Sequence, residues 1–170
     1  TLFFASDRLG GFGMSDIYFS VKNNESWTTA KNMGPIINTR GNEVSPFYHA
    51  VFDVMYFSSN GQLYNFGAYD IYKSYKIGEN WSEPINIGPL VNGKGSEFYF
   101  TIDSESKNLY YARSTSSDLK KLDLYSFPLP MGARPDARAR LIGSLRDSLT
   151  GQPFGGIVSV IDMDDGIEVA

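Results

Sequence analysis

"MYFSSNGQLYNFGAYDIYKS", residues 55–74, decides the fold, because the chain uses the same pattern once before. The earlier copy is "LFFASDRLGGFGMSDIYFS", residues 2–20. In both copies an aromatic run leads into a loop that contains glycine, and Asp16-Ile17-Tyr18 recurs as Asp70-Ile71-Tyr72 after 54 residues. Self-similarity at a period of about 50 residues indicates a repeat architecture.

The repeat extends well beyond these two segments. Further matches at the same spacing are Trp27 with Trp81, Gly34-Pro35 with Gly88-Pro89, Asn38 with Asn92, Gly41 with Gly95 and Glu43 with Glu97. A weaker third copy contains Leu109–Arg113 and then Asp123-Leu124-Tyr125. The sequence therefore predicts at least three successive units, of which the third has lost the Gly-rich loop.

Each unit is expected to form four short strands. In the second unit these are residues 43–49, 54–58, 69–75 and 81–87, separated by turn-forming residues such as Asn60-Gly61. Pro84 lacks a backbone donor, which places the fourth strand at an outer edge. The 11 Tyr and 12 Phe favour strands. Four strands per repeat predict an all-β fold, a partial β-propeller of four-stranded blades.

These motifs resemble the TolB-type, WD-like propeller repeats of bacterial envelope proteins. The resemblance covers roughly residues 2–127 and is carried by the two segments quoted above and by "MGPIINTRGNEVSPFY", residues 33–48. The pattern departs from the family at residues 49–53, where the family has a Ser-Pro-Asp-Gly turn. A propeller needs about four to eight blades, so further blades are expected upstream of Thr1.

A change in composition marks the end of the repeats. Residues 1–127 are assigned to the propeller, residues 128–139 to an extended Pro-rich linker, and residues 140–170 to the start of another domain. That last segment is similar to the opening of carboxypeptidase-regulatory-like domains, which are small β-sandwiches, and contains their Thr-Gly-x-Pro turn at residues 150–153. Only the start of such a sandwich is present.

This order of domains resembles that of OmpA-family envelope proteins of Bacteroidetes, which include a peptidoglycan-anchoring component of the type IX secretion system. The resemblance implies a periplasmic, outer-membrane-associated protein. Its partners would be envelope proteins, with peptidoglycan bound through domains outside this chain.

Composition excludes several other classes. The net charge of −4 gives no chain-wide electrostatic footprint for nucleic acid. The chain has no cysteine, so disulfides and thiolate metal sites are excluded. No apolar run is long enough to span a bilayer as a helix, and no cofactor or metal site is expected.

The repeated polar and aromatic residues have structural and functional readings. Asp16, Asp70 and Asp123 would either form repeated ligand sites or, as repetition favours, accept backbone N–H bonds from the loops before them. Trp27 and Trp81 would either form a sugar-stacking platform or fill the space between blades. The second reading predicts that both rings are largely buried.

The expected function is a non-catalytic protein-interaction scaffold, because no asymmetric set of nucleophile, base and oxyanion donors is present. The candidate contact surface is the loop rim, which we define as Leu9–Met14 with Leu63–Ala68. Its proposed contacts are Phe12, Leu63, Tyr64 and Phe66, followed by Glu43 and Glu97, which either face a central channel or bond to the backbone. In the alternative interpretation, Phe12 and Phe66 have a structural role and are buried anchors of the loops.

Two other functions compete with the scaffold. One is a propeller that hydrolyses glycans, which requires a pair of carboxylates about 5–10 Å apart. The other is glycan binding without hydrolysis. His49 is the single histidine and is interpreted as a turn residue.

Overall fold

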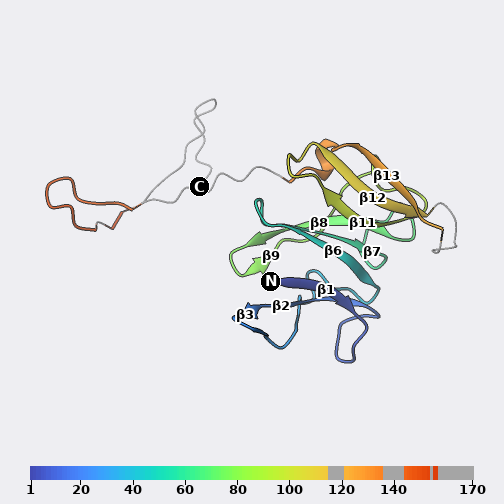
Figure 1. The fold of residues 1–170 in the computed structure, drawn as a ribbon, viewed down its shortest axis with the longest axis horizontal. Coiled ribbons are helices and arrows are strands. Elements are labelled where there is room, and N and C mark those ends of the chain that lie inside the picture. The colour runs from blue at the N-terminus through green and yellow to red at the C-terminus, as the bar shows by residue number, and fades with distance from the viewer. Residues whose placement is uncertain (115–120, 136–143, 154, 157–170) are drawn as a thin grey trace. The chain divides into compact units, whose positions relative to one another are not determined.

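The computed structural model describes residues 1–114, 121–135, 144–153 and 155–156. The chain divides into two compact units, Thr1–Ala137 and Arg138–Ala170. In the described residues the first unit is built from short antiparallel strands and one 3-10 turn, η1 (Met131–Ala133). The predicted all-β class is therefore confirmed. Figure 1 shows the three larger sheets as successive layers, which form no closed ring.

The second sheet matches the four strands expected from the sequence. Its order is β10-β8-β7-β6, all antiparallel, with β6 at Glu43–His49, β7 at Val54–Ser59, β8 at Asp70–Ile77 and β10 at Ile85–Asn86. A short strand β9 (Asn80–Trp81) folds back on β8 as a hairpin. Pro84 lies between β9 and β10, and β10 is the predicted edge strand.

The first sheet is a shorter version of the same arrangement. Its order is β1-β2-β5, with β1 at Leu2–Ser6, β2 at Asp16–Ser20 and β5 at Lys31–Asn32. A hairpin of β3 (Lys22–Asn23) and β4 (Ser26–Trp27) is the counterpart of the β8–β9 hairpin. Lys22 pairs with Trp27 just as Lys76 pairs with Trp81, so the register repeats as well.

The third sheet has the order β11-β12-β13, with β11 at Ser96–Ile102, β12 at Asn108–Ser114 and β13 at Asp123–Pro128. Both β6 and β11 contain a register shift, at Ser45 and at Tyr99, where φ is +53° and +55°. The two sites are 54 residues apart. Even this irregularity is therefore part of the repeat.

The core consists of the two contacts between successive sheets. Between the first and second sheets, buried Ile17, Met33 and Ile37 pack against Met55, Phe57 and Tyr72. On its other face the second sheet presents Val54, Tyr56, Ile71 and Tyr75 to Phe100, Leu109 and Tyr111 of the third. Isolated parallel bridges, Ser15 with Asn42 and Tyr69 with Ser96, also join neighbouring sheets. The second sheet is thus covered on both faces.

The segment after β13 differs from the extended linker predicted there. Leu129 and Ala133 are buried in the core, and the Tyr56 hydroxyl donates a hydrogen bond to the Ala133 carbonyl at 2.8 Å. Burial of these small apolar side chains holds residues 129–134 against the second and third sheets. Residues 136–139 of the predicted linker lie outside the described residues.

The second unit is described only in part. Arg146 and Pro153 form an isolated bridge around the predicted turn, in which Asp147 accepts bonds from the Leu149 and Thr150 amides. Most residues of the predicted β-sandwich start lie outside the described residues. Within the described residues, no helix has the length and apolar character needed to cross a membrane.

Candidate interaction site

The Gly-rich loops are held by the aspartates that follow them. Asp16 accepts hydrogen bonds from the backbone amides of Phe12 and Gly13, at 2.6 and 3.1 Å. Asp70 accepts the equivalent bonds from Phe66 and Gly67, at 2.7 and 3.0 Å. Both carboxylates are buried. The structural interpretation is therefore confirmed for these two, whereas Asp123 is exposed and the loop before it lies outside the described residues.

Two asparagines per unit complete this network. Asn32 donates from its amide to Asp16, and Asn38 bonds both the amide and the carbonyl of Ile17. Asn86 and Asn92 repeat these bonds around Asp70 and Ile71. Asn38 and Asn92 are matches in the sequence repeat, whereas Asn32 and Asn86, which also recur after 54 residues, were not among the predicted functional residues.

The two loops are joined through the segment that precedes β6. The Met14 amide donates to the Gly41 carbonyl at 2.8 Å, and the Asn42 amide donates to the Asn60 side chain at 2.8 Å. A Cβ on Gly13 would overlap the Thr39 carbonyl oxygen, so only glycine allows this close approach. The two loops are therefore linked by hydrogen bonds through residues 41–42.

The loop rim exposes its apolar side chains. Leu63 and Tyr64 are 92% and 79% exposed, and Phe12 and Phe66 are 49% and 51% exposed. The alternative that Phe12 and Phe66 are buried loop anchors is therefore wrong. Leu9 and Met14 are also exposed and add to the same surface. The loops therefore expose apolar area at this end of the sheets.

Glu43 does not belong to this exposed surface. It is fully buried and accepts hydrogen bonds from the Thr39 amide, the Thr39 hydroxyl and the Ser59 hydroxyl, at 2.7, 2.7 and 2.6 Å. Burial raises the pKa of its carboxyl, and these three bonds oppose the rise. Glu43 is thus bonded to the backbone, as one of the two interpretations held, and lacks the exposure that a contact residue needs.

Glu97 lies at the equivalent position with different partners. Its side chain is fully buried, and its Oε1 accepts from the Gly93 amide at 3.2 Å and from Arg113 Nε at 2.9 Å. Burial raises the pKa of this carboxyl to about 7, although the Gly93 amide and the Arg113 guanidinium lower it. Oε2 has no hydrogen-bond partner within the described residues. Glu97 is likewise unavailable for contact.

The tryptophans do not form a platform. Trp81 is half-buried and packs edge-to-face with Phe3 and Tyr48, at ring-centroid distances of 6.5 and 6.1 Å. Trp27 is 51% exposed, so the prediction of burial is wrong for this residue. The difference arises because the first sheet supplies partners for Trp81, whereas no sheet in the described residues covers the corresponding side of Trp27.

The remaining candidates add no chemical site. His49 is half-buried at the end of β6, beside Phe47 and Phe52, rather than in a turn. Within the described ranges, no three His, Cys, Asp or Glu side chains are grouped closely enough to hold a metal ion. Comparison of the chain with protein-family models, with curated proteins and with solved structures finds no match.

Proposed function

We propose that residues 1–127, with the docked segment that follows them, are three consecutive blades of a β-propeller. In this proposal the propeller is a non-catalytic scaffold that binds other proteins through the loop rim. Support comes from the way the sheets pack and from the apolar side chains that the loops expose. The carboxylates Asp16, Asp70, Glu43 and Glu97 are engaged in holding loops, which argues against a hydrolytic role for them.

The packing of the sheets supports the propeller because it is repetitive and directional. Met55, Phe57 and Tyr72 of the second sheet bury against the first sheet. The first sheet carries Leu2, Phe4 and Tyr18 at the equivalent positions, on a face that no described sheet covers. Each of the three sheets has the same stacked aromatic pair there: Phe4 with Tyr18, Phe57 with Tyr72, and Tyr111 with Tyr125.

The outer face of the third sheet is complementary to the outer face of the first sheet. Tyr110 and Leu124 of the third sheet correspond to the buried Tyr56 and Ile71 of the second, but are 38% and 79% exposed. The uncovered face of the first sheet and the uncovered face of the third sheet are therefore the two sides of the interface that the sheets form with one another. Such head-to-tail interfaces can close into rings. Three blades are too few for a ring, so the proposal requires further blades against these two faces.

The exposed loop rim is the observation that carries the binding function. Contiguous exposed apolar patches on soluble proteins commonly mark interaction sites. The buried aspartates fix the loops before binding, which reduces the entropy lost when a partner docks. Aromatic side chains such as Tyr64 are enriched at protein interfaces. Partner binding, rather than catalysis, follows from such a surface.

The cellular setting of the proposal rests on the sequence resemblance. In this proposal the protein lies in the periplasm, associated with the outer membrane, as OmpA-family envelope proteins and their secretion-system relatives do. Envelope proteins would then contact the loop rim. Peptidoglycan would be bound through domains outside this chain.

The test is a capture experiment from an envelope extract with the tagged chain, read by quantitative mass spectrometry. The rim variant is Leu63→Ser with Tyr64→Ser. The matched control is Val51→Ser, which removes an apolar side chain that is 81% exposed at the opposite end of the second sheet. Captured proteins are then purified and titrated against each variant.

We expect the rim variant to lose a defined partner that the wild type and the Val51→Ser control retain. A hot-spot aromatic contributes about 2 kcal/mol or more, which weakens binding at least about thirtyfold. If the rim variant and the control capture the same proteins with equal affinity, the loop rim is not the interface.

A further inference from the structure

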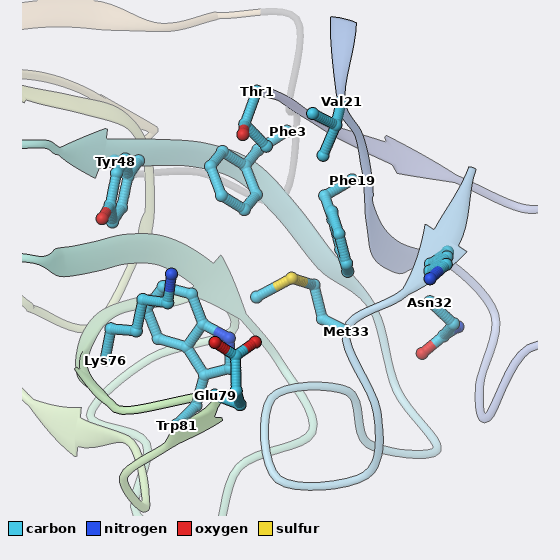
Figure 2. A pocket seen from close by; sticks show the side chains of 11 residues that line it. Thr1, Phe3, Phe19, Val21, Asn32, Met33, Tyr48, Lys76, Glu79 and Trp81 are labelled. Atoms are coloured by element: carbon cyan, nitrogen blue, oxygen red, sulfur yellow. The ribbon is translucent and has the colours of Figure 1, made fainter. Parts of the chain in front are cut away.

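A pocket lies between the first and second sheets, at the end opposite to the loop rim. Its volume is about 480 Å³. The strand ends that form it carry Phe3, Phe19 and Tyr48, whereas the loop rim follows Ser6 of β1 and Ser59 of β7, at the other end of the two sheets. Figure 2 shows Phe3, Phe19 and Met33 on one side of the pocket and Trp81 on the other. The pocket is therefore spatially separate from the proposed interaction surface.

The equivalent place between the second and third sheets is filled by the chain itself. Tyr56, Lys73 and Ile87 are the counterparts there of Phe3, Phe19 and Met33. Leu129–Arg134 occupies this place: Lys73 Nζ donates to the Arg134 carbonyl at 2.8 Å, and Leu129 and Ala133 join the core cluster. A Cβ on Gly132 would lie 2.9 Å from the Ile87 carbonyl oxygen, which shows how closely the segment fits.

The first pair of sheets lacks this filling because the corresponding segment takes another path. Residues 129–134 follow β13 as residues 76–81 follow the matching part of β8. Residues 76–81 form the β8–β9 hairpin, so Trp81 is the apolar side chain of this segment that reaches the pocket, together with the charged side chains of Lys76 and Glu79. The pocket between the first and second sheets therefore corresponds to the space that Leu129–Arg134 fills between the second and third sheets.

The lining has the chemistry for such a segment. Six side chains supply an apolar and aromatic surface: Phe3, Phe19, Val21, Met33, Tyr48 and Trp81. Lys31, Lys76 and Glu79 lie at the pocket, and none of them makes an ion pair within the described residues. Two ammonium groups against one carboxylate leave the pocket with a net positive charge, which favours an acidic flank on the occupant.

We propose that this pocket binds a short apolar segment of a partner protein, of the leucine- and proline-containing kind that fills the second interface, flanked by acidic residues. Apolar side chains of the segment enter between Phe19, Met33 and Trp81. The flanking carboxylates meet Lys31 and Lys76. This site is independent of the loop rim.

The test uses the whole chain with Trp27→Phe, so that Trp81 is the remaining tryptophan and its emission is followed. The probe is the synthetic peptide Glu-Phe-Pro-Leu-Pro-Met-Gly-Ala-Glu, which carries the docked sequence between two acidic residues. Two matched peptides replace either Leu and Met by Ser, or both Glu by Lys. Protein variants are Lys31→Glu with Lys76→Glu at the pocket, and Leu63→Ser with Tyr64→Ser at the loop rim.

We expect saturable peptide binding that shifts the Trp81 emission. Binding is expected to be about fivefold weaker for the double charge reversal, equally weakened for the Lys-flanked peptide, and lost for the Ser-substituted peptide. The rim variant should bind the peptide like the wild type. The proposal is overturned if Trp81 emission does not respond at millimolar peptide, if the Ser-substituted peptide binds equally well, or if the charge reversals change nothing.

Discussion

Glu43 and Glu97 occupy the same place in successive repeats, yet they are stabilised in different ways. Glu43 is surrounded by neutral donors, the amide and hydroxyl of Thr39 and the hydroxyl of Ser59. Glu97 has Gly93 and Arg113 at the positions of Thr39 and Ser59, so one hydroxyl is lost and the other is replaced by a guanidinium. Backbone geometry is kept, while the electrostatics change.

The difference shows what repetition controls in this chain. The features that set the backbone recur: the Asp and Asn networks, the register shifts in β6 and β11, and the loop glycines. The side chains that complete the buried glutamate sites, around Glu43 and Glu97, do not recur. The repeat therefore preserves the backbone structure, while the charged and polar groups around the buried glutamate differ from one unit to the next.

The largest expected change in the free energy of unfolding comes from removing a side-chain partner of Glu97 or of Glu43. Arg113→Met leaves Glu97 buried without a cation, which should lower the free energy of unfolding by about 3 kcal/mol at pH 8. Ser59→Ala at the matched position removes one hydrogen bond to Glu43 and should cost about 1–2 kcal/mol. Urea denaturation of both variants measures the two values. Equal losses would mean that Arg113 acts as a simple hydrogen-bond donor.

The pH dependence of stability should separate the same two sites. Burial raises the folded-state pKa of Glu97 to about 7, from an ordinary value of 4.5. The native state then holds the proton more tightly, so this contribution to stability is full below about pH 4.5 and is lost as the pH rises through 7. A shift of this size corresponds to about 3 kcal/mol.

Glu97→Gln should abolish that loss of stability between pH 5 and pH 8. Glu43→Gln should change the pH profile less, because three hydrogen bonds to the Glu43 carboxylate oppose the effect of burial on its pKa. Chemical denaturation at several pH values provides the comparison. A Glu97→Gln profile that still falls by the wild-type amount would locate the titrating group elsewhere.

The sequence could predict the repeated part of this molecule because each match was seen twice. The strands of the second sheet, the edge position after Pro84 and the loop-holding role of Asp16 and Asp70 all follow from local pattern and turn chemistry. The burial of Glu43 and Glu97 could not be read in that way. It depends on neighbouring segments that close over the carboxylates, which strand periodicity does not encode.

The errors also come from tertiary contacts. Residues 129–134 look like a linker because proline and glycine break strand patterns, yet Leu129 and Ala133 fit between two sheets. Trp27 and Trp81 occupy equivalent positions in the repeat, but their burial depends on whether another sheet is present beside them. Sequence repetition reports what two units share and says nothing of what lies next to each.

The two tryptophans test the same difference between the repeats, with smaller expected changes in the free energy of unfolding. Trp81→Ala removes a ring packed on Phe3 and Tyr48 and should cost about 2 kcal/mol, below the range for a fully buried ring. Trp27→Ala should cost less than about 0.5 kcal/mol in this chain, as expected for an exposed position. Thermal and urea unfolding measure both. A large cost for Trp27→Ala would show that another surface covers it in solution.

The smallest expected effect tests whether the loop rim is free of any structural role. Leu63→Ser with Tyr64→Ser should change the free energy of unfolding by no more than about 0.5 kcal/mol, because both side chains are largely exposed. The Tyr64 backbone carbonyl stabilises the loop, because it accepts hydrogen bonds from the Tyr72 hydroxyl and the Asn86 side-chain amide. The double substitution leaves that carbonyl in place. Asn86→Ala is the matched control, since Asn86 also donates to Asp70, and it should cost about 1–2 kcal/mol. If the double variant is destabilised as much as Asn86→Ala, the exposed side chains support the loop, and a loss of partner binding by that variant would no longer identify a contact surface.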